Sequence, residues 1–336
     1  MSETGPRWIT EADVVSVMDM PGAIRALEAG LLAEARGAAM NMAKTHVEWG
    51  GHGTLHAIGA AFPEAELVGT KTWAHTPGGA TPLLILYDSR TGALKAVVEA
   101  FALGQLRTGA ASGVATRLLA AAAADELAIV GTGKQSIPQI AAVAAVRRLR
   151  RVRVFGRDPE RRARCVARVS EEIGVEAVEA SSIAEAVRNA PIITVVTRAR
   201  EPFLTAAMVA RGAHINAVGA IVPSGAEVAG DVLARCTHVV VDSPPQAQRL
   251  SKELMDYYGA DDAAWQRVRP LSAIVAEGGH RAAADDVTLF KSLGMGISDL
   301  ALAVEIYSAA VRAGLGTPLA PPRPAPPRLR GEYHPA

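Results

Sequence analysis

The residues with the clearest chemical potential form a short glycine-rich run between an apolar segment and a helical pattern. The run consists of Gly131, Thr132, Gly133, Lys134 and Gln135. Its first glycine permits a tight turn, its second lets the backbone approach a pyrophosphate, and the N–H groups that open the following helix attract the anion. Ser136 replaces the third glycine of the usual pattern. The run predicts a dinucleotide site, with a purely structural turn as the alternative.

A second apolar segment, residues 151–155, ends where nucleotide domains contact the adenosine ribose, about 25 residues beyond Gly131. It is followed by Gly156, Arg157 and Asp158. An acidic residue at the strand end would bind a free 2′-hydroxyl, whereas glycine followed by arginine suits a 2′-phosphate, so the pattern favours NADPH over NADH. The alternative is that Arg157 is a solvated loop charge and that Asp158 caps the helix beginning at Pro159.

The elements that would position these residues alternate regularly along the chain. Apolar segments at 175–178, 192–196, 214–218 and 239–241 are separated by helical stretches, which predicts a parallel sheet covered by helices. Residues 102–122 predict one long alanine-rich helix that leads into this region. Residues 285–294 are interpreted as a loop that enters a helix, with Lys291 as a possible exposed charge.

Composition narrows the class of protein. A chain of 336 residues exceeds what one core usually holds and predicts two domains. The net charge of +1 has no basic footprint for nucleic acid, which favours a small-molecule partner. Cys165 and Cys236 lack the spacing of a zinc site, so no metal is expected, and both are interpreted as reduced thiols of a cytoplasmic protein. Neither a secretory leader nor a membrane span is recognisable in the sequence.

Several blocks in order resemble the ornithine cyclodeaminase/mu-crystallin family, from about Glu11 to Pro318. The blocks are Gly69–Lys71, Leu106–Ser112, Gly131–Gln135, Gly212–Gly219 and Phe290–Gly294. The resemblance implies an α/β fold in which a Rossmann-type doubly wound parallel sheet is inserted into a second α+β substrate and dimerisation domain. It implies a homodimer, with residues 1–112 plus 305–320 in the substrate domain, 113–304 in the dinucleotide domain and 321–336 as a Pro-rich tail.

Lys71 is the first catalytic candidate. It stands in an apolar strand without an acidic neighbour in the sequence, so burial would lower its pKa and make it a usable proton donor. A lysine at a strand edge could instead extend to water. The resemblance implies the catalytic role, because family members place a lysine here beside the reacting carbon.

Arg107 matches the family arginine that binds the substrate carboxylate, for which a forked guanidinium is suited. Three other positions depart from the family pattern. Lys44 replaces a second arginine, His56 replaces a glutamate of the cyclodeaminases, and Ile221 replaces their catalytic aspartate. These changes disfavour ornithine cyclisation, which needs a carboxylate to handle the attacking amine, and leave hydride transfer possible.

The remaining candidates surround these residues. Trp73 and His75 are expected to line the substrate site, although a strand tryptophan is often core and a histidine near a turn is often solvated. Asp299 is interpreted as a polar helix position without a catalytic role, and the side-chain roles of His214 and Asn216 stay open. Further cofactor contacts are expected from Thr108, Thr197, Val218, Ser292 and Gly294.

The function predicted from these residues is an NAD(P)H-dependent reductase of ketimines or cyclic imines, equivalent to an amine or amino-acid dehydrogenase in reverse. Lys71 would give a proton to the imine nitrogen as hydride reaches the carbon. Two alternatives remain. One is an ornithine cyclodeaminase that uses NAD⁺ without net redox change, and the other is a crystallin-like protein that binds NADPH and a small ligand without turnover.

Overall fold

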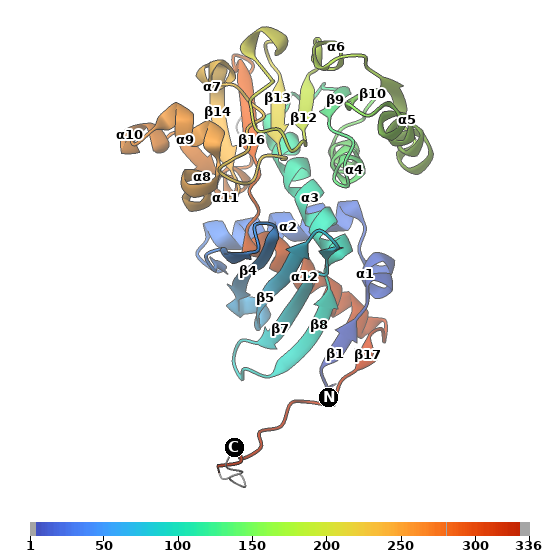
Figure 1. The fold of residues 1–336 in the computed structure, drawn as a ribbon, viewed down its shortest axis with the longest axis vertical. Helices are drawn as coiled ribbons and strands as arrows, with labels where there is room; N and C mark the ends of the chain where they lie inside the picture. The colour runs from blue at the N-terminus through green and yellow to red at the C-terminus, as the bar shows by residue number, and fades with distance from the viewer. Residues whose placement is uncertain (1–4, 280, 330–336) are drawn as a thin grey trace.

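The computed structural model describes residues 5–279 and 281–329 and contains two sheets arranged along the long axis of the molecule (Figure 1). The first sheet has nine strands in the order β17-β1-β8-β7-β5-β4-β2, with β3 paired to β4 and β6 to β5. Its pairings are antiparallel except that between β1 and β8. The strands are β1 (Arg7–Ile9), β2 (Met40–Asn41), β3 (Thr45–Trp49), β4 (Gly53–Phe62), β5 (Leu67–Thr76), β6 (Gly79–Ala80), β7 (Leu83–Asp88), β8 (Leu94–Glu99) and β17 (Thr317–Pro318).

The second sheet has eight parallel strands in the order β11-β10-β9-β12-β13-β16-β14-β15. The chain order reverses between β9 and β12, which makes this the switch point where doubly wound sheets bind ligands at their carboxyl edge. The strands are β9 (Glu126–Val130), β10 (Arg151–Phe155), β11 (Glu176–Glu179), β12 (Ile192–Val195), β13 (His214–Ala217), β14 (Cys236–Val241), β15 (Val268–Pro270) and β16 (Val287–Lys291). This arrangement confirms the predicted α/β fold with a parallel sheet and a second sheet.

Helices cover both faces of the parallel sheet and one face of the first sheet (Figure 1). The longer helices are α2 (Met20–Ala35), α3 (Phe101–Leu119), α4 (Ser136–Val146), α5 (Pro159–Arg168) and α12 (Gly296–Arg312). The shorter ones are α1 (Glu11–Val17), α6 (Ile183–Val187), α7 (Gly230–Arg235), α8 (Pro244–Leu250), α9 (Lys252–Tyr258), α10 (Asp262–Trp265) and α11 (Leu271–Ala276), with single turns η1 (Pro63–Ala65), η2 (Val169–Ile173) and η3 (Ala206–Met208).

Helix α3 joins the two sheets, and its small residues explain how. A Cβ on Gly109 would lie 2.7 Å from the carbonyl oxygen of Pro138, so only glycine lets α3 approach α4 this closely. The expected domain boundaries at 112/113 and 304/305 fall inside α3 and α12, which run without a break across them. Helix α3 contacts α2 on one side and α4, β13 and β16 on the other, so it belongs to both parts of the molecule.

The interpretation of residues 285–294 as a loop entering a helix was wrong. Residues 287–291 form β16, which lies between β13 and β14 in the parallel sheet. All five residues of this strand are buried, so no polar face remains to give the alternation of an exposed strand. Lys291 is 1 % exposed rather than an exposed helix charge, and its Nζ lies 2.7 Å from Oε2 of Glu253.

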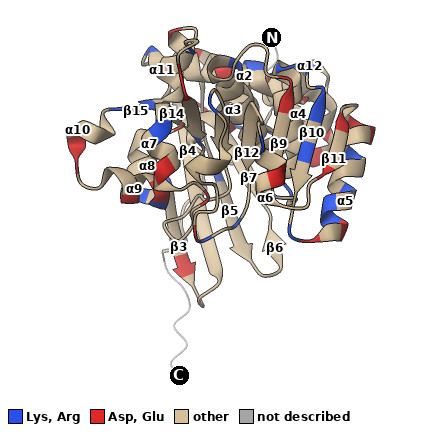
Figure 2. Cartoon of the chain, turned by 90° about the horizontal axis from the view of Figure 1, so that it is seen from above, with Lys and Arg blue, Asp and Glu red and all other residues tan. Residues whose placement is uncertain are grey.

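Charged residues of both signs are interspersed over the outer helices and strand ends (Figure 2), so no face shown there is of one sign. Among the described residues, no helix is long and apolar enough to cross a membrane. The described part of the expected Pro-rich tail, residues 321–329, has neither helix nor strand, while 330–336 lie outside the described residues.

Candidate active site

The glycine-rich turn sits at the switch point of the parallel sheet. Gly131 has φ +121°, and a Cβ there would lie 2.5 Å from the carbonyl oxygen of Val196, the residue after β12. Its N–H donates to the carbonyl oxygen of Phe155 at the end of β10 (2.8 Å). The turn is thus held between the strands on both sides, and any other residue would be strained.

The second glycine plays a different role from the first. No atom lies within 4 Å of the position that a Cβ on Gly133 would occupy, so the space next to this backbone is open. Ser136 is buried and its hydroxyl donates to the carbonyl oxygen of Gly133 (2.8 Å), while the Cys165 thiol donates to the Ser136 hydroxyl (3.7 Å). Ser136 therefore joins α4 to α5, at the position where the usual pattern has a third glycine for close packing of the helix on the strand.

At the end of β10, a Cβ on Gly156 would lie 2.6 Å from Oγ1 of Thr132, which keeps the two loops in contact. Asp158 is exposed and its carboxylate accepts from the Arg161 N–H (3.1 Å) as the N-cap of α5. Arg157 is exposed beside it. Asp158 therefore acts as the helix cap that the alternative interpretation predicted. Arg157 is the other charged side chain at this strand end.

The substrate-side candidates meet around Asp299, which was interpreted from the sequence as a polar helix position without a catalytic role. Asp299 on α12 accepts a short hydrogen bond from Lys71 on β5, and Arg107 on α3 places Nε 3.3 Å from the same oxygen. Lys71 is 5 % and Asp299 1 % exposed, whereas the Arg107 side chain keeps 18 % of its surface. Oδ2 of Asp299 and Nε of Arg107 are buried without a hydrogen-bond partner, so the cluster retains capacity for a further polar group.

Burial lowers the pKa of Lys71 to about 8, opposed by the negative charge of Asp299 and assisted by the positive charge of Arg107. A pKa near neutrality suits a general acid, because the group is protonated at pH 7 and still releases its proton readily. Burial, and next the charge of Arg107, also lower the pKa of Lys44. Three cations and Asp299 thus share this region, an environment favourable for an anion.

The two halves of the site approach each other on the first turns of α3. A Cβ on Gly104 would lie 3.9 Å from Nζ of Lys71, and Nζ of Lys134 in the glycine-rich run lies 5.3 Å from the centre of the Phe101 ring. One turn later, Gln139 of α4 donates to the carbonyl oxygen of Thr108 (3.1 Å). The hydroxyl of Thr108 donates within α3, to the carbonyl oxygen of Gly104 (2.8 Å).

Other predicted site residues are distributed as follows. Trp73 stacks on His56, with ring centres 4.7 Å apart, and His75 is exposed two residues beyond Trp73. Ile221 is 40 % exposed in the loop after β13, while Val218 at its start is buried. The loop after β13 thus carries an apolar side chain at position 221, where the cyclodeaminases are expected to have their catalytic aspartate.

Three buried carboxylates organise the loops at the carboxyl edge of the parallel sheet. Glu227 accepts from the N–H and hydroxyl of Thr197 and from the N–H groups of Gly219 and Ala220. Glu253 in turn accepts from the N–H groups of Glu227 and Val228 and pairs with Lys291.

Asp242 directly follows β14 and accepts from the Ser292 hydroxyl (3.2 Å) and from the N–H groups of Leu293 and Gly294. A Cβ on Gly294, where φ is +83°, would lie 2.8 Å from Nη1 of Arg107. Three residues expected to contact the cofactor, Thr197, Ser292 and Gly294, thus donate hydrogen bonds to these buried carboxylates. The only feature of the sequence that could have indicated a site role for Asp242 is its position at the end of a strand. No local feature of the sequence indicated that Asp299 would contact Lys71 and Arg107.

His214 and Asn216 are structural in this chain. His214 contacts the Thr288 hydroxyl (2.9 Å) and the Asn216 carbonyl (3.1 Å), and Asn216 donates to Thr116 of α3 (2.9 Å). Burial lowers the pKa of His214 to about 3, so the ring is neutral. The pair ties β13 to α3 away from the carboxyl edge.

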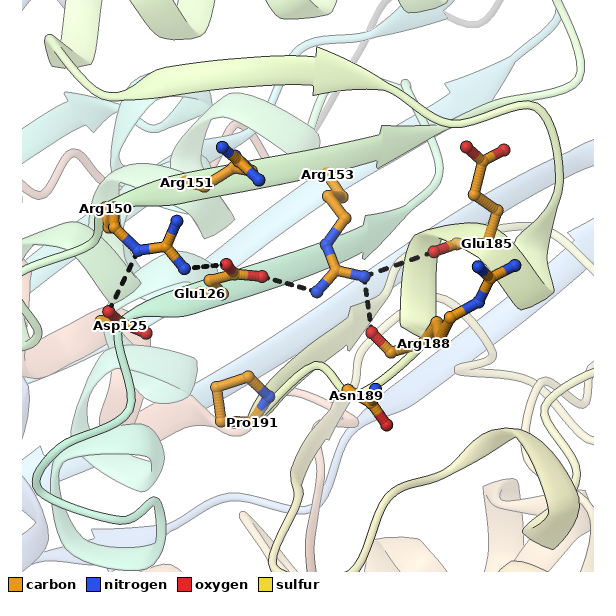
Figure 3. A pocket seen from close by; sticks show the side chains of 9 residues that line it. All are labelled: Asp125, Glu126, Arg150, Arg151, Arg153, Glu185, Arg188, Asn189 and Pro191. Atoms are coloured by element: carbon orange, nitrogen blue, oxygen red, sulfur yellow. Dashed lines mark hydrogen bonds and ion pairs between the residues drawn. The ribbon is translucent and has the colours of Figure 1, made fainter.

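A pocket of about 650 Å³ opens at the amino edge of the parallel sheet, opposite to the edge that carries the glycine-rich turn (Figure 3). Two of its arginines bind groups that line the same pocket. Arg153 binds Glu126 and the carbonyl oxygens of Glu185 and Arg188, and Arg150 binds Asp125 and Glu126. Ligands of doubly wound sheets bind at the carboxyl edge, so this pocket is not the dinucleotide site.

The sequence model of the ornithine cyclodeaminase/mu-crystallin family matches residues 7–314. The chain belongs to this family. It is 32 % identical over 268 residues to a Delta(1)-pyrroline-2-carboxylate reductase of Bacillus cereus, with 78 % of this chain and 80 % of the relative covered. It is 34 % identical over 224 residues to the mouse (Mus musculus) ketimine reductase mu-crystallin, covering 67 % of this chain and 68 % of the relative.

Among solved structures, the fold is similar to that of Thermococcus litoralis Delta(1)-pyrroline-2-carboxylate reductase in complex with NADH and L-proline. The TM-score is 0.87 at 27 % identity, with 93 % of this chain and 100 % of the other covered. The likeness extends across both sheets of this family member, since it spans nearly the whole chain.

Proposed function

We propose that this family member is an NAD(P)H-dependent oxidoreductase that reduces ketimines or cyclic imines. The observation that carries the proposal is the buried Lys71–Asp299–Arg107 cluster, which adjoins the same turns of α3 that contact the glycine-rich run. The relatives named as pyrroline-2-carboxylate and ketimine reductases support the same reaction class.

A dinucleotide held at the turn of Gly131 and Gly133 would supply the hydride for the imine carbon. The Lys71 ammonium donates a proton to the imine nitrogen, so that C=N gains one hydride and one proton and becomes CH–NH. The Arg107 guanidinium and the Lys44 ammonium bind a substrate carboxylate and orient the imine. Asp299 holds the Lys71 ammonium in place and keeps it charged between turnovers.

For the cofactor, the open space at Gly133 and the φ of Gly131 support a dinucleotide whose pyrophosphate approaches the turn before α4. We infer a preference for NADPH, because Arg157 is exposed at the end of β10 while Asp158 is occupied as the cap of α5. Ornithine cyclisation is disfavoured, because Ile221 provides no carboxylate in the loop after β13.

We further propose a homodimer that covers the outer face of the first sheet. Register places Val47, Leu55 and Ala74 on one face, opposite to the face that carries His46, His56 and Trp73. Val47 is 56 % and Leu55 46 % exposed. An apolar face of this kind is usually covered in an oligomer. Sedimentation of the wild type and of Val47→Asp should give a dimer and a monomer respectively; a monomeric wild type contradicts the proposal.

Both cysteines are free and buried, which supports the reducing, cytoplasmic location inferred from the sequence.

The function is tested by mixing the purified protein with NADPH or NADH and either Δ1-pyrroline-2-carboxylate or Δ1-piperideine-2-carboxylate. Cofactor oxidation that requires the imine, with one amine formed per cofactor consumed, is expected. Cofactor binding without turnover of any imine would contradict the proposal and favour a binding role. Conversion of ornithine to proline and ammonia without net cofactor change would establish the cyclodeaminase instead.

A further inference from the structure

Three aromatic side chains stand side by side on the face of the first sheet that carries Lys71. His46 of β3, His56 of β4 and Trp73 of β5 are directly opposed across neighbouring strands. Side chains two residues apart in a strand point to the same face, so Trp73 and Lys71 share it. We call these three residues the His–Trp stack.

The His–Trp stack is a set of nearly parallel planes. The rings of His46 and His56 are 5.6 Å apart with planes inclined by 23°, and those of His56 and Trp73 are 4.7 Å apart and inclined by 16°. The Nζ of Lys71 lies 5.1 Å from the centre of the Trp73 ring. The indole therefore adjoins the proposed proton donor and continues outwards into two imidazoles.

His56, the central ring of the stack, is uncharged although cations surround it. Partial burial lowers the pKa of His56 to about 4, with further lowering by the charges of Lys44, His46 and His75 against a small opposing effect of Glu48. The Lys44 charge acts on His56, and Lys44 itself responds to Arg107, Asp242 and Asp299. The charge of Lys44 thus acts on both the ionic cluster and the stack. At pH 7 His56 presents a neutral ring, so His56 and Trp73 together offer a flat, uncharged π surface.

One polar atom of the stack is unused. The Nε2 of His56 contacts the Thr54 hydroxyl (2.9 Å), whereas its Nδ1 is buried without a hydrogen-bond partner. Buried polar groups are nearly always paired, so an unpaired ring nitrogen beside Lys71 and Trp73 suits a site that a ligand completes.

We propose that the His56–Trp73 part of the stack determines substrate specificity by packing against a flat, uncharged side chain of the imine, an aromatic or planar ring. A side-chain ammonium would meet three cations, Lys44, Lys71 and Arg107, and the carboxylate of Asp299 already pairs with two of them through Oδ1. This inference rests on the proposed imine reductase activity and names the class of substrate for that same site.

The test uses ketimines formed in situ from methylamine and four 2-oxo acids, with Δ1-pyrroline-2-carboxylate as a reference. The oxo acids carry a phenyl ring (phenylpyruvate), a methyl group (pyruvate), a second carboxylate (2-oxoglutarate) or a trimethylammonium group. We expect kcat/KM for the phenyl imine to exceed that for the methyl imine by about ten-fold or more, and the trimethylammonium imine to be the poorest. Higher kcat/KM for the carboxylate or trimethylammonium imine overturns the inference.

Two variants separate stacking from folding. In Trp73→Leu the phenyl-to-methyl ratio of kcat/KM should fall by about ten-fold, and Trp73→Phe should retain most of the ratio because a flat ring remains. If Trp73→Leu does not fold, His56→Leu provides the same comparison at the adjacent ring. An unchanged ratio in folded variants overturns the inference. Turnover of pyrroline-2-carboxylate without phenyl preference rejects this inference alone, whereas failure of every imine rejects the proposed function.

Discussion

The carboxyl edge of the parallel sheet and the Lys71 face of the antiparallel sheet are built on different principles. At the carboxyl edge, the proposed dinucleotide site depends on the backbone of two nearby residues, through the φ of Gly131 and the open space at Gly133. On the Lys71 face, the decisive features are side chains from β5, α3 and α12, which are distant in the chain. A contiguous turn can be formed locally, whereas a charged cluster depends on how three elements pack. The two regions should therefore respond differently to substitution.

The largest expected effect is the separation of chemistry from dinucleotide binding. Lys71→Met should lower kcat for imine reduction by about 10²- to 10⁴-fold, because no proton donor remains beside the nitrogen. The Kd for NADPH, measured by fluorescence titration, should stay within a few-fold of wild type. Lys252→Met, which removes a surface ammonium paired with Asp256, is the matched control. Equal losses in both Lys variants would show that the cluster is not catalytic.

A smaller and more diagnostic effect is expected at the acid partner. The charge of Asp299 raises the pKa of Lys71 against the lowering caused by burial. Imine reduction should therefore decline as pH rises through about 8, where the Lys71 ammonium is lost. Asp299→Asn should shift this alkaline limb to lower pH, and should lower kcat at pH 7 by about ten-fold or more.

The control for that experiment is the acidic partner of a surface pair, Asp256→Asn, which should leave the limb in place. A pH profile that does not move in Asp299→Asn, in a protein that folds and binds cofactor normally, would remove the assigned role of Asp299.

The two glycines of the turn provide a comparison within the cofactor edge. Gly131→Ala should lower the free energy of unfolding by about 1–3 kcal/mol, because of its φ and the Val196 carbonyl oxygen. Gly133→Ala should change stability by less than about 0.5 kcal/mol and weaken NADPH binding by about ten-fold. Urea unfolding and fluorescence titration measure both. Similar stability in the two variants would contradict the separate roles.

The smallest expected effect concerns the choice of cofactor. Arg157→Ala should raise the Kd for NADPH by about five- to ten-fold and leave that for NADH nearly unchanged, as expected for one exposed charge-assisted contact to a 2′-phosphate. Arg164→Ala removes an exposed arginine further along α5 and serves as the control. Equal effects of Arg157→Ala on both cofactors would remove the argument for NADPH.

Prediction from the sequence was accurate where local rules operate. The long helix expected over 102–122 is α3, Phe101–Leu119, because its apolar spacing is helical. The failure at β16 has a local cause as well, since a strand buried on both faces shows no alternation and here includes Thr288 and Lys291. The burial of Lys291 could not be predicted from its own segment, because its partner Glu253 lies in α9.

The parallel sheet, the glycine-rich turn and the family blocks could be predicted from the amino-acid sequence. They follow from backbone freedom and strand periodicity, which neighbouring residues set. The pairing of Asp299 with Lys71, the choice of Asp158 as the cap of α5 and the stacking of His46, His56 and Trp73 depend on how distant elements pack. Lys71 and Asp299 are separated by 228 positions, and their contact exists because β5 and α12 pack together and exclude water from both charges.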